Sequence, residues 1–188
     1  MNLEALREPL NINEIDFRVQ SINKGKYVTI LAYKDARADM NRLDKVVGAI
    51  GWKREHLNNN HNCIVSLFDS ENKQWVSKED VGTESFTEKE KGLASDSFKR
   101  ACFNWGIGRE LYDYPLIQFK LNDNEVDEYN GKLKLSYKAN FSDWRWFSQF
   151  EDGKISFLGV KDTNEKLRFS WGKFIKEKTE EESWIYTI

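Results

Sequence analysis

The stretch from Phe86 to Tyr114 constrains the fold of this chain more than any other. It opens with Thr87 and, three residues later, Glu90, a pair that is typical of a helix N-terminus. Apolar residues then recur at helical spacing until Gly106 and Gly108, where a left-handed turn costs little. The predicted buried stripe comprises Ala94, Phe98, Ala101, Cys102 and Trp105. We therefore predict one long helix that ends in glycines and packs one side against a core.

The opposite side of this predicted helix carries an unusual set of residues. At 100° per residue it presents Asp96, Lys99, Arg100 and Phe103. Two adjacent cations beside an aromatic ring form a surface that a ligand could use. The alternative is an ordinary solvated helix, in which Asp96 pairs with Lys99 or Arg100 along the same helix. The residues alone leave both interpretations open.

Patterns on both sides of this helix predict an α+β protein. Upstream, a helix is predicted that is capped by Asp35 and ends at Gly48, and a shorter one at 2–10 that ends near Pro9. Alternating apolar residues predict strands at 15–20, 26–32, 51–57, 63–68 and 74–80. This order predicts an antiparallel β-sheet with a β-β-β-α core, packed against helices on one face.

The composition shifts towards strands after Pro115. Asn130-Gly131 is a strong signal for a two-residue hairpin turn. Strands are predicted at 116–121, 132–137, 144–150, 155–160 and 166–171. We expect residues 1–115 to form the functional core and residues 116–188 a β-rich C-terminal extension.

Several function classes lack their sequence signatures. The chain has no Walker loop, no G-x-S-x-G elbow and no dinucleotide fingerprint, so we expect neither an enzyme nor a cofactor. His61 and Cys63 have a spacing that suits a metal, but further ligands are missing, so no metal site is expected. Two cysteines and no apolar run long enough to span a bilayer indicate a cytoplasmic protein without a membrane segment.

One group of carboxylates keeps an enzymatic alternative open. Glu79, Asp80 and Glu84 could hold a divalent ion for phosphodiester cleavage, which would make the chain a metal-dependent nuclease. The favoured interpretation is that these are turn and edge-strand charges, which prevent a sheet edge from pairing wrongly.

Charge is segregated along the chain although its net value is only −2. Between Arg18 and Leu57 there are nine Lys or Arg and four Asp or Glu, whereas between Leu67 and Asp96 eight acids face four lysines. An acidic protein can therefore still present a basic groove. Complementary faces between subunits would produce the same pattern.

Three segments of the chain resemble one known family. They are Gly25 to Trp52 (GKYVTILAYKDARADMNRLDKVVGAIGW), Glu79 to Gly82 (EDVG) and Lys91 to Gly108 (KGLASDSFKRACFNWGIG). The resemblance is to the single-strand annealing proteins of homologous recombination, which include the eukaryotic Rad-fifty-two mediator and its compact phage relatives of the Sak type. It covers residues 10 to 115 approximately, and the order of the segments agrees with the strand, strand, strand, helix core of that family.

The resemblance implies an ATP-independent protein that binds single-stranded DNA irrespective of sequence and anneals complementary strands in DNA repair. It also implies a homo-oligomer, either a ring or a helical filament, with the DNA in a basic groove. A recombinase or a single-stranded-DNA-binding protein is a candidate further partner. A phage-encoded member would act in the host cytoplasm.

The family's Lys-Arg pair corresponds to Lys99 and Arg100. One turn later the family commonly has another basic residue, and this chain has Phe103. An arginine at the start of the family's preceding helix aligns with Ala38, so Arg37 is its nearest match. The predicted DNA-binding residues are Lys99, Arg100, Phe103, Arg37, Lys34, Lys53, Arg54 and Lys91.

These residue types suit a sequence-independent binder of single strands. Cations bind phosphates, while Phe103 either stacks on bases or contacts another subunit. The other wall of the groove is expected from Lys34, Arg37, Lys53 and Arg54. The remaining alternative is a structural or partner-binding oligomer without DNA activity, whose segregated charges serve protein contacts alone.

Overall fold

The computed structural model describes residues 3–83 and 89–175, with the backbone alone for residues 89–91. Within these residues the chain forms two α-helices and eleven strands, and the strands form four small antiparallel sheets. This confirms the predicted α+β class with a β-rich C-terminal part. The strands of the first half form two separate sheets rather than the single sheet that was predicted, because β3–β5 pair only with one another.

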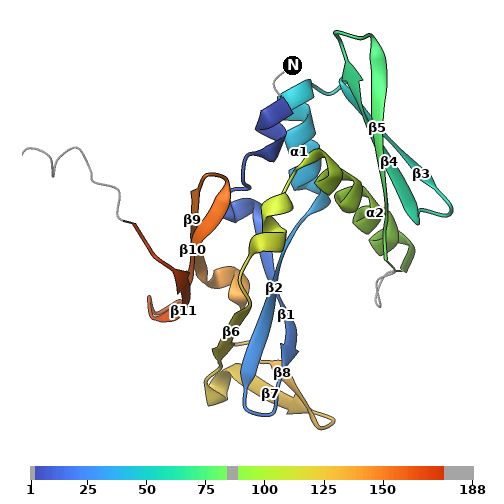
Figure 1. Ribbon diagram of the computed structural model, residues 1–188. Coiled ribbons are helices and arrows are strands. Elements are labelled where there is room, and N and C mark those ends of the chain that lie inside the picture. The colour runs from blue at the N-terminus through green and yellow to red at the C-terminus, as the bar shows by residue number, and fades with distance from the viewer. Residues whose placement is uncertain (1–2, 84–88, 176–188) are drawn as a thin grey trace, which may run out of the picture.

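A long hairpin forms the centre of the molecule (Figure 1). Its strands are β1 (Ile15–Ile22) and β2 (Tyr27–Lys34), and β6 (Ile117–Lys120) pairs with the other edge of β2. We call this three-stranded sheet the central sheet. Successive side chains of a strand point to opposite faces, so Val28 and Ile30 are buried on one face while their neighbours lie on the other.

The first helix, α1 (Ala36–Val47), begins and ends where the sequence predicts. The Asp35 side chain accepts a hydrogen bond of 2.7 Å from the backbone N–H of Arg37, which satisfies a donor that the helix itself cannot pair. Gly48 follows the helix with a φ of +78°, a conformation that glycine adopts without strain. The apolar side of α1 buries Leu43 in the core that it shares with α2.

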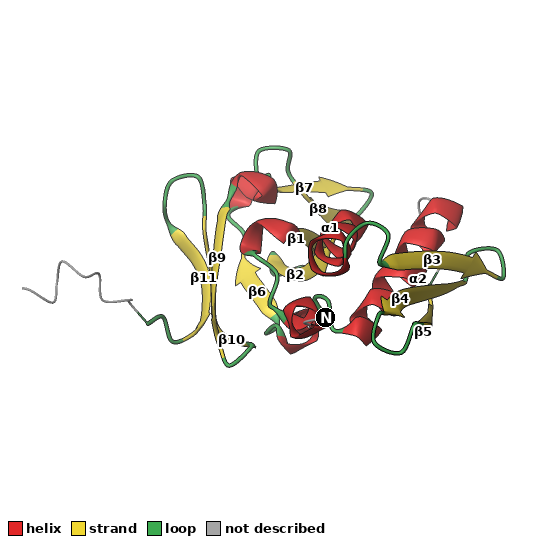
Figure 2. Ribbon diagram, turned by 90° about the horizontal axis from the view of Figure 1, so that it is seen from above, coloured by secondary structure: helices red, strands yellow, loops and turns green. Residues whose placement is uncertain are grey.

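The second sheet consists of β3 (Trp52–Leu57), β4 (Asn62–Asp69) and β5 (Gln74–Val81), and α2 (Lys89–Trp105) covers one of its faces. Figures 1 and 2 show this unit on one side of the central sheet. The predicted stripe of α2 is confirmed. Its fully buried members are Phe98, Ala101 and Cys102, while Trp105 is nearly so and Ala94 is half-buried.

Two glycines allow α2 to lie where it does. A Cβ at Gly82 would lie 2.6 Å from the backbone nitrogen of Ser97, so the chain after β5 can approach α2 closely only without a side chain. Gly108, beyond α2, has a φ of +71°, and a Cβ there would lie 2.8 Å from the side chain of Lys34. The predicted capping pair Thr87–Glu90 lies outside the described side chains.

The C-terminal extension packs on the buried face of the central sheet. Besides β6, its strands are β7 (Val126–Tyr129), β8 (Lys132–Leu135), β9 (Arg145–Glu151), β10 (Lys154–Lys161) and β11 (Leu167–Gly172). The shared core includes Val28, Ile30, Phe119, Phe141, Trp144, Leu158 and Val160. Since β6 follows Pro115 but pairs with β2, the extension shares both a sheet and a core with the first part of the chain.

Short 3-10 helices connect these elements, at Leu3–Arg7, Ile12–Glu14, Arg109–Asp113, Asp123–Glu125 and Phe141–Asp143. The first of them occupies the place of the helix predicted at 2–10. Among the helices that the structure describes, none has both the length and the apolar character to cross a membrane.

Candidate nucleic-acid interface

Lys99 and Arg100, the two adjacent cations of α2, point in different directions. Lys99 Nζ lies 6.0 Å from the centre of the Tyr33 ring, towards the central sheet. Arg100 turns to β5, where its Nε lies 3.3 Å from Asp80 Oδ1. In the described residues neither cation forms a salt bridge with Asp96, which instead accepts hydrogen bonds from the backbone and hydroxyl of Thr83. The simple alternative of pairing along the helix is therefore wrong.

Tyr33 lies at the centre of a group that we call the Tyr33 cluster, which consists of Arg18, Tyr33, Arg37 and Lys99. The guanidinium carbon of Arg18 lies 5.0 Å from the Tyr33 ring centre, so two cations approach the same ring. Tyr33 pairs with Asp16 in the β1–β2 register, which puts Arg18 two residues along on the same exposed face. Burial, helped by the charge of Asp16, raises the pKa of Tyr33, so its hydroxyl keeps its proton at neutral pH.

Arg37 joins the cluster from the first turn of α1. Its Nε and Nη2 each lie 3.1 Å from a carboxylate oxygen of Asp35, and its side chain is 79% exposed. Hydrogen bonds from Arg37 lower the pKa of Asp35, and the charge on Lys99 adds to this effect. Lys99 and Arg37 thus act on one carboxylate, which brings two of the predicted DNA-binding cations to the same site.

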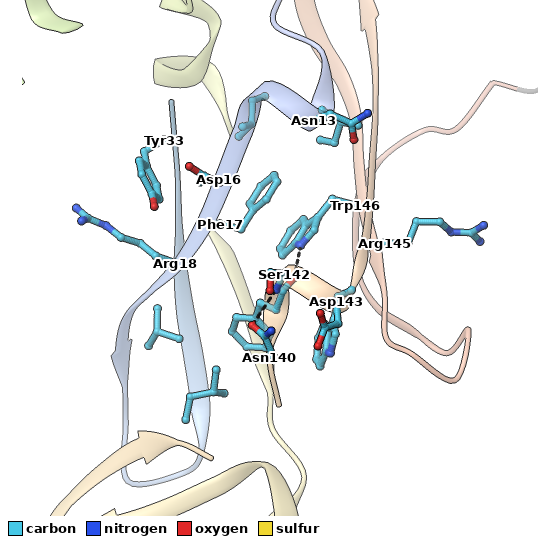
Figure 3. Close-up of a pocket in the computed structure, with 16 residues that line it drawn as sticks. Asn13, Asp16, Phe17, Arg18, Tyr33, Asn140, Ser142, Asp143, Arg145 and Trp146 are labelled. Carbon is cyan, nitrogen blue, oxygen red and sulfur yellow. Dashed lines mark hydrogen bonds between the residues drawn. The ribbon is translucent and has the colours of Figure 1, made fainter. Parts of the chain in front are cut away.

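A groove of about 740 Å³ runs beside the cluster, between the edge of β1 and residues 140–146. In Figure 3, Arg18 and Tyr33 lie on one side of β1, and Phe17 and Trp146 lie on the other. The Phe17 and Trp146 rings stack in parallel, with centres 3.6 Å apart. Arg18 and Tyr33 also line the groove, so these two members of the Tyr33 cluster form part of its rim. The site therefore combines the exposed cation Arg18 with aromatic walls.

Lys53 and Arg54 do not form the single wall that was predicted. They are neighbours on β3, so their side chains leave opposite faces of the second sheet. Arg54 lies towards α2, with its guanidinium carbon 4.9 Å from the Phe98 ring centre. Lys53 lies on the other face, with Nζ 4.7 Å from the Trp75 ring centre.

Lys34 is not available to a nucleic acid, which corrects its predicted role. It is the last residue of β2, on the same face as Val28 and Ile30, and only 1% of it is exposed. Its ammonium group donates hydrogen bonds to Asp39 Oδ1 and to the carbonyl of Ile107. Lys34 thus joins β2, α1 and the glycine-rich end of α2, and it serves the core rather than the surface.

Phe103 is held by contacts within the chain. Lys34 Nζ lies 3.9 Å from its ring centre, and the Tyr112 ring centre lies 4.8 Å away. Because the ring is half-buried between these neighbours, its predicted choice between base stacking and a subunit contact stays a prediction. Lys91, another predicted DNA-binding residue, lies outside the described side chains.

The buried carboxyl of Asp39 should contribute more to stability in mild acid than at neutral pH. Burial outweighs the attraction of Lys34 and raises the pKa of Asp39 to about 6. An unfolded aspartate titrates near 3.9, so this contribution is complete below about pH 4 and is lost as the pH rises through the folded pKa. Denaturant unfolding from pH 7.5 to 4 should show the wild type gaining up to about 3 kcal/mol relative to Asp39→Asn. A constant difference between the two proteins would contradict this assignment.

Two members of the Tyr33 cluster, Arg18 and Tyr33, were missed by sequence reasoning. Both lie on the exposed face of the β1–β2 hairpin, which strand alternation identifies. What alternation does not reveal is that α2 approaches this face and brings Lys99 to it. No model of a known protein family and no curated protein matches the chain. The function is therefore argued from the geometry of the site and the short motifs described above.

Proposed function

We propose that this protein binds single-stranded DNA irrespective of sequence and anneals complementary strands without ATP, acting as a homo-oligomer in homologous recombination. The observation that carries the proposal is the Tyr33 cluster, in which Lys99 and Arg18 approach one half-buried aromatic ring and Arg37 lies beside them. These residues come from four different elements, β1, β2, α1 and α2. A convergence of that kind supports a binding surface rather than a solvated helix.

The chemistry of the cluster suits the backbone of a single strand. Cations bind phosphates without reading sequence, and aromatic rings stack on any base. Annealing requires that phosphate repulsion is screened while the base edges stay free to pair, and contacts to the backbone achieve this. Because the contacts are between cations and phosphates, we expect binding to be salt-sensitive. Asp35 and Asp16 reduce the local positive charge, so we expect a moderate affinity for a single subunit. Simultaneous binding by many adjoining subunits would multiply the overall affinity.

The uncovered face of the second sheet supports the proposed homo-oligomer. α2 covers one face, and the other exposes Leu57, Trp75 and Val81. Leu57 and Val81 lie on either side of Asn62 in the strand register, at one end of this face, and Trp75 lies at the other end of β5. A sheet face that has no helix over it and exposes apolar side chains is available for a contact between subunits.

Among the described residues, the carboxylates of the nuclease alternative do not lie together as ligands of one metal ion. Glu79 and Asp80 are neighbours on β5, so they leave opposite faces of the sheet. Asp80 accepts hydrogen bonds from Arg100 and Asn104, and Glu79 accepts one from Asn62. No group of three potential metal ligands occurs in the described part of the chain, and Glu84 lies outside it. We therefore retain strand annealing as the proposal.

Replacing Lys99 and Arg18 together by alanine should weaken binding to single-stranded oligonucleotides of every sequence. Each lost phosphate contact lowers the salt dependence, so the slope of log affinity against log salt should become shallower by about 1.4 for the pair. Fluorescence anisotropy at several salt concentrations measures both quantities. Annealing of labelled complementary strands, without nucleotide, should slow in parallel.

A matched control removes two exposed lysines from the C-terminal extension, Lys154→Ala with Lys166→Ala, and changes the net charge equally. This control should bind DNA as the wild type does. If the Lys99 and Arg18 variant also binds and anneals normally, the Tyr33 cluster is not the DNA site. A wild-type protein that ignores DNA and stays monomeric would instead favour a structural role.

A further inference from the structure

We propose that the β7–β8 hairpin is a second contact for the same single strand and extends the path that begins at the Tyr33 cluster. The hairpin belongs to the C-terminal extension, which the resemblance to annealing proteins does not cover. This inference rests on the proposed function, because it assigns the same ligand. It concerns a different set of residues, so an experiment can exclude the hairpin contact without excluding the proposed function.

The register of the hairpin separates an inner from an outer face. Asn130 and Gly131 form the turn with φ of +51° and +70°, the pair of conformations that a tight hairpin turn requires. Val126 pairs with Leu135, and both pack against the shared core. The alternate positions therefore face outwards, and they are occupied by Asp127, Tyr129, Lys132 and Lys134.

The outer face of the hairpin and the segment just beyond β8 each carry an exposed tyrosine beside a lysine. Tyr129 is 63% exposed, and Lys134 Nζ lies 5.1 Å from its ring centre. Just beyond β8, Tyr137 is 86% exposed, and Lys138 Nζ lies 5.7 Å from its ring centre. Neither ring is buried in the hydrophobic core. An aromatic face beside a cation is the pairing that single-strand binding requires.

The position of the hairpin continues the candidate interface. Leu135 of β8 lines the same groove as Arg18 and Tyr33. In both ribbon views the turn of the hairpin lies on the side of the central sheet where α2 lies (Figures 1 and 2). A strand that is bound at Lys99 and follows the β1–β2 hairpin away from α2 would therefore reach the β7–β8 hairpin.

Charge favours a polyanion over an apolar partner at this hairpin. From Val126 to Lys138 there are three lysines and two acids, although the whole chain has a net charge of −2. The exposed rings stand singly, each with its own lysine, and do not merge into an apolar patch. Alternating cations and rings match alternating phosphates and bases.

The test compares the full-length wild type with Tyr129→Ala plus Tyr137→Ala, using fluorescent oligothymidylates of graded length. The shortest oligonucleotides that the wild type binds should bind both proteins equally, because the Tyr33 cluster is intact. Longer ones should bind the variant at least fivefold more weakly, since one base–aromatic stack contributes about 1–3 kcal/mol. Tyr129→Phe plus Tyr137→Phe keeps the rings and should retain wild-type affinity at every length.

Each outcome decides the proposal. Equal affinity of the alanine pair at all lengths overturns the hairpin contact while the Tyr33 cluster stands. A change in oligomer size with unchanged DNA affinity overturns it as well and assigns the hairpin to a contact between subunits. Failure of the phenylalanine pair to retain affinity shows that stacking is not involved and also overturns it. A wild type that binds no oligonucleotide removes the proposed function and this inference together.

Discussion

A Lys34→Ala variant should lose about 3–5 kcal/mol of its free energy of unfolding at pH 7.5. The side chains of Lys34 and Asp39 are 1% and 0% exposed, and each provides the charge that the other needs. Removing the ammonium group leaves a buried carboxylate without its partner and leaves the Ile107 carbonyl without its donor. Chemical denaturation followed by circular dichroism measures the loss. Its size would make Lys34 one of the most important residues for stability.

A double replacement and a surface control make this prediction specific. Lys34→Met with Asp39→Leu removes both charges and keeps similar volumes, so it should lose far less stability than Lys34→Ala. Lys53→Ala removes an exposed lysine and should change the free energy of unfolding by less than about 0.5 kcal/mol. A loss below about 1 kcal/mol for Lys34→Ala would mean that this ammonium group is hydrated in solution.

An Arg168→Ala variant should lose a similar amount, about 3–5 kcal/mol, and should loosen the C-terminal extension. Arg168 donates to both carboxylate oxygens of Glu125, at 2.6 and 2.8 Å, and to Asp162 at 3.2 Å. Its guanidinium carbon also lies 4.7 Å from the Trp144 ring centre. Burial alone would raise the pKa of Glu125, but the hydrogen bonds from Arg168 hold it below its usual value. Two nearly buried carboxylates therefore share one guanidinium.

Arg168→Lys should restore only part of this stability, because an ammonium group cannot form the paired hydrogen bonds of a guanidinium. Lys166→Ala, two residues away and exposed, is the control and should be nearly neutral. Hydrogen exchange should locate the loss in β9–β11 and in the segment around Glu125. An Arg168→Ala variant with wild-type stability would show that solvent already screens these carboxylates.

The burial of Lys34 is indicated by the alternation of residues along β2, although the count of charged residues does not reveal it. Val28, Ile30, Ala32 and Lys34 share one face of β2 by simple alternation, and that face is buried. The basic stretch suggested a groove wall because charge was considered without strand period. The same period separates Lys53 from Arg54, since neighbours in a strand cannot line one wall.

Local sequence signals were sufficient to predict the helix ends, the buried stripe and the hairpin turn. The cap at Asp35, the glycine after α1, the buried stripe of α2 and the Asn130-Gly131 turn all act within a few residues, so their signals survive in the sequence. The proposed function is in part of this kind, because the Lys99-Arg100 pair that suggests it lies within one helix. The predicted division at Pro115 is also local, but the sheet extends across it.

Tertiary packing alone decided the site. Lys99 reaches Tyr33 because α2 packs on β3–β5 and its free side then faces the β1–β2 hairpin, an arrangement of segments that are distant in the chain. That packing also determines which cations are exposed and which are buried, because the segments packed against an ammonium group set its surroundings. The residues of each strand and helix determine which face is apolar, whereas only the assembled fold determines what that face meets.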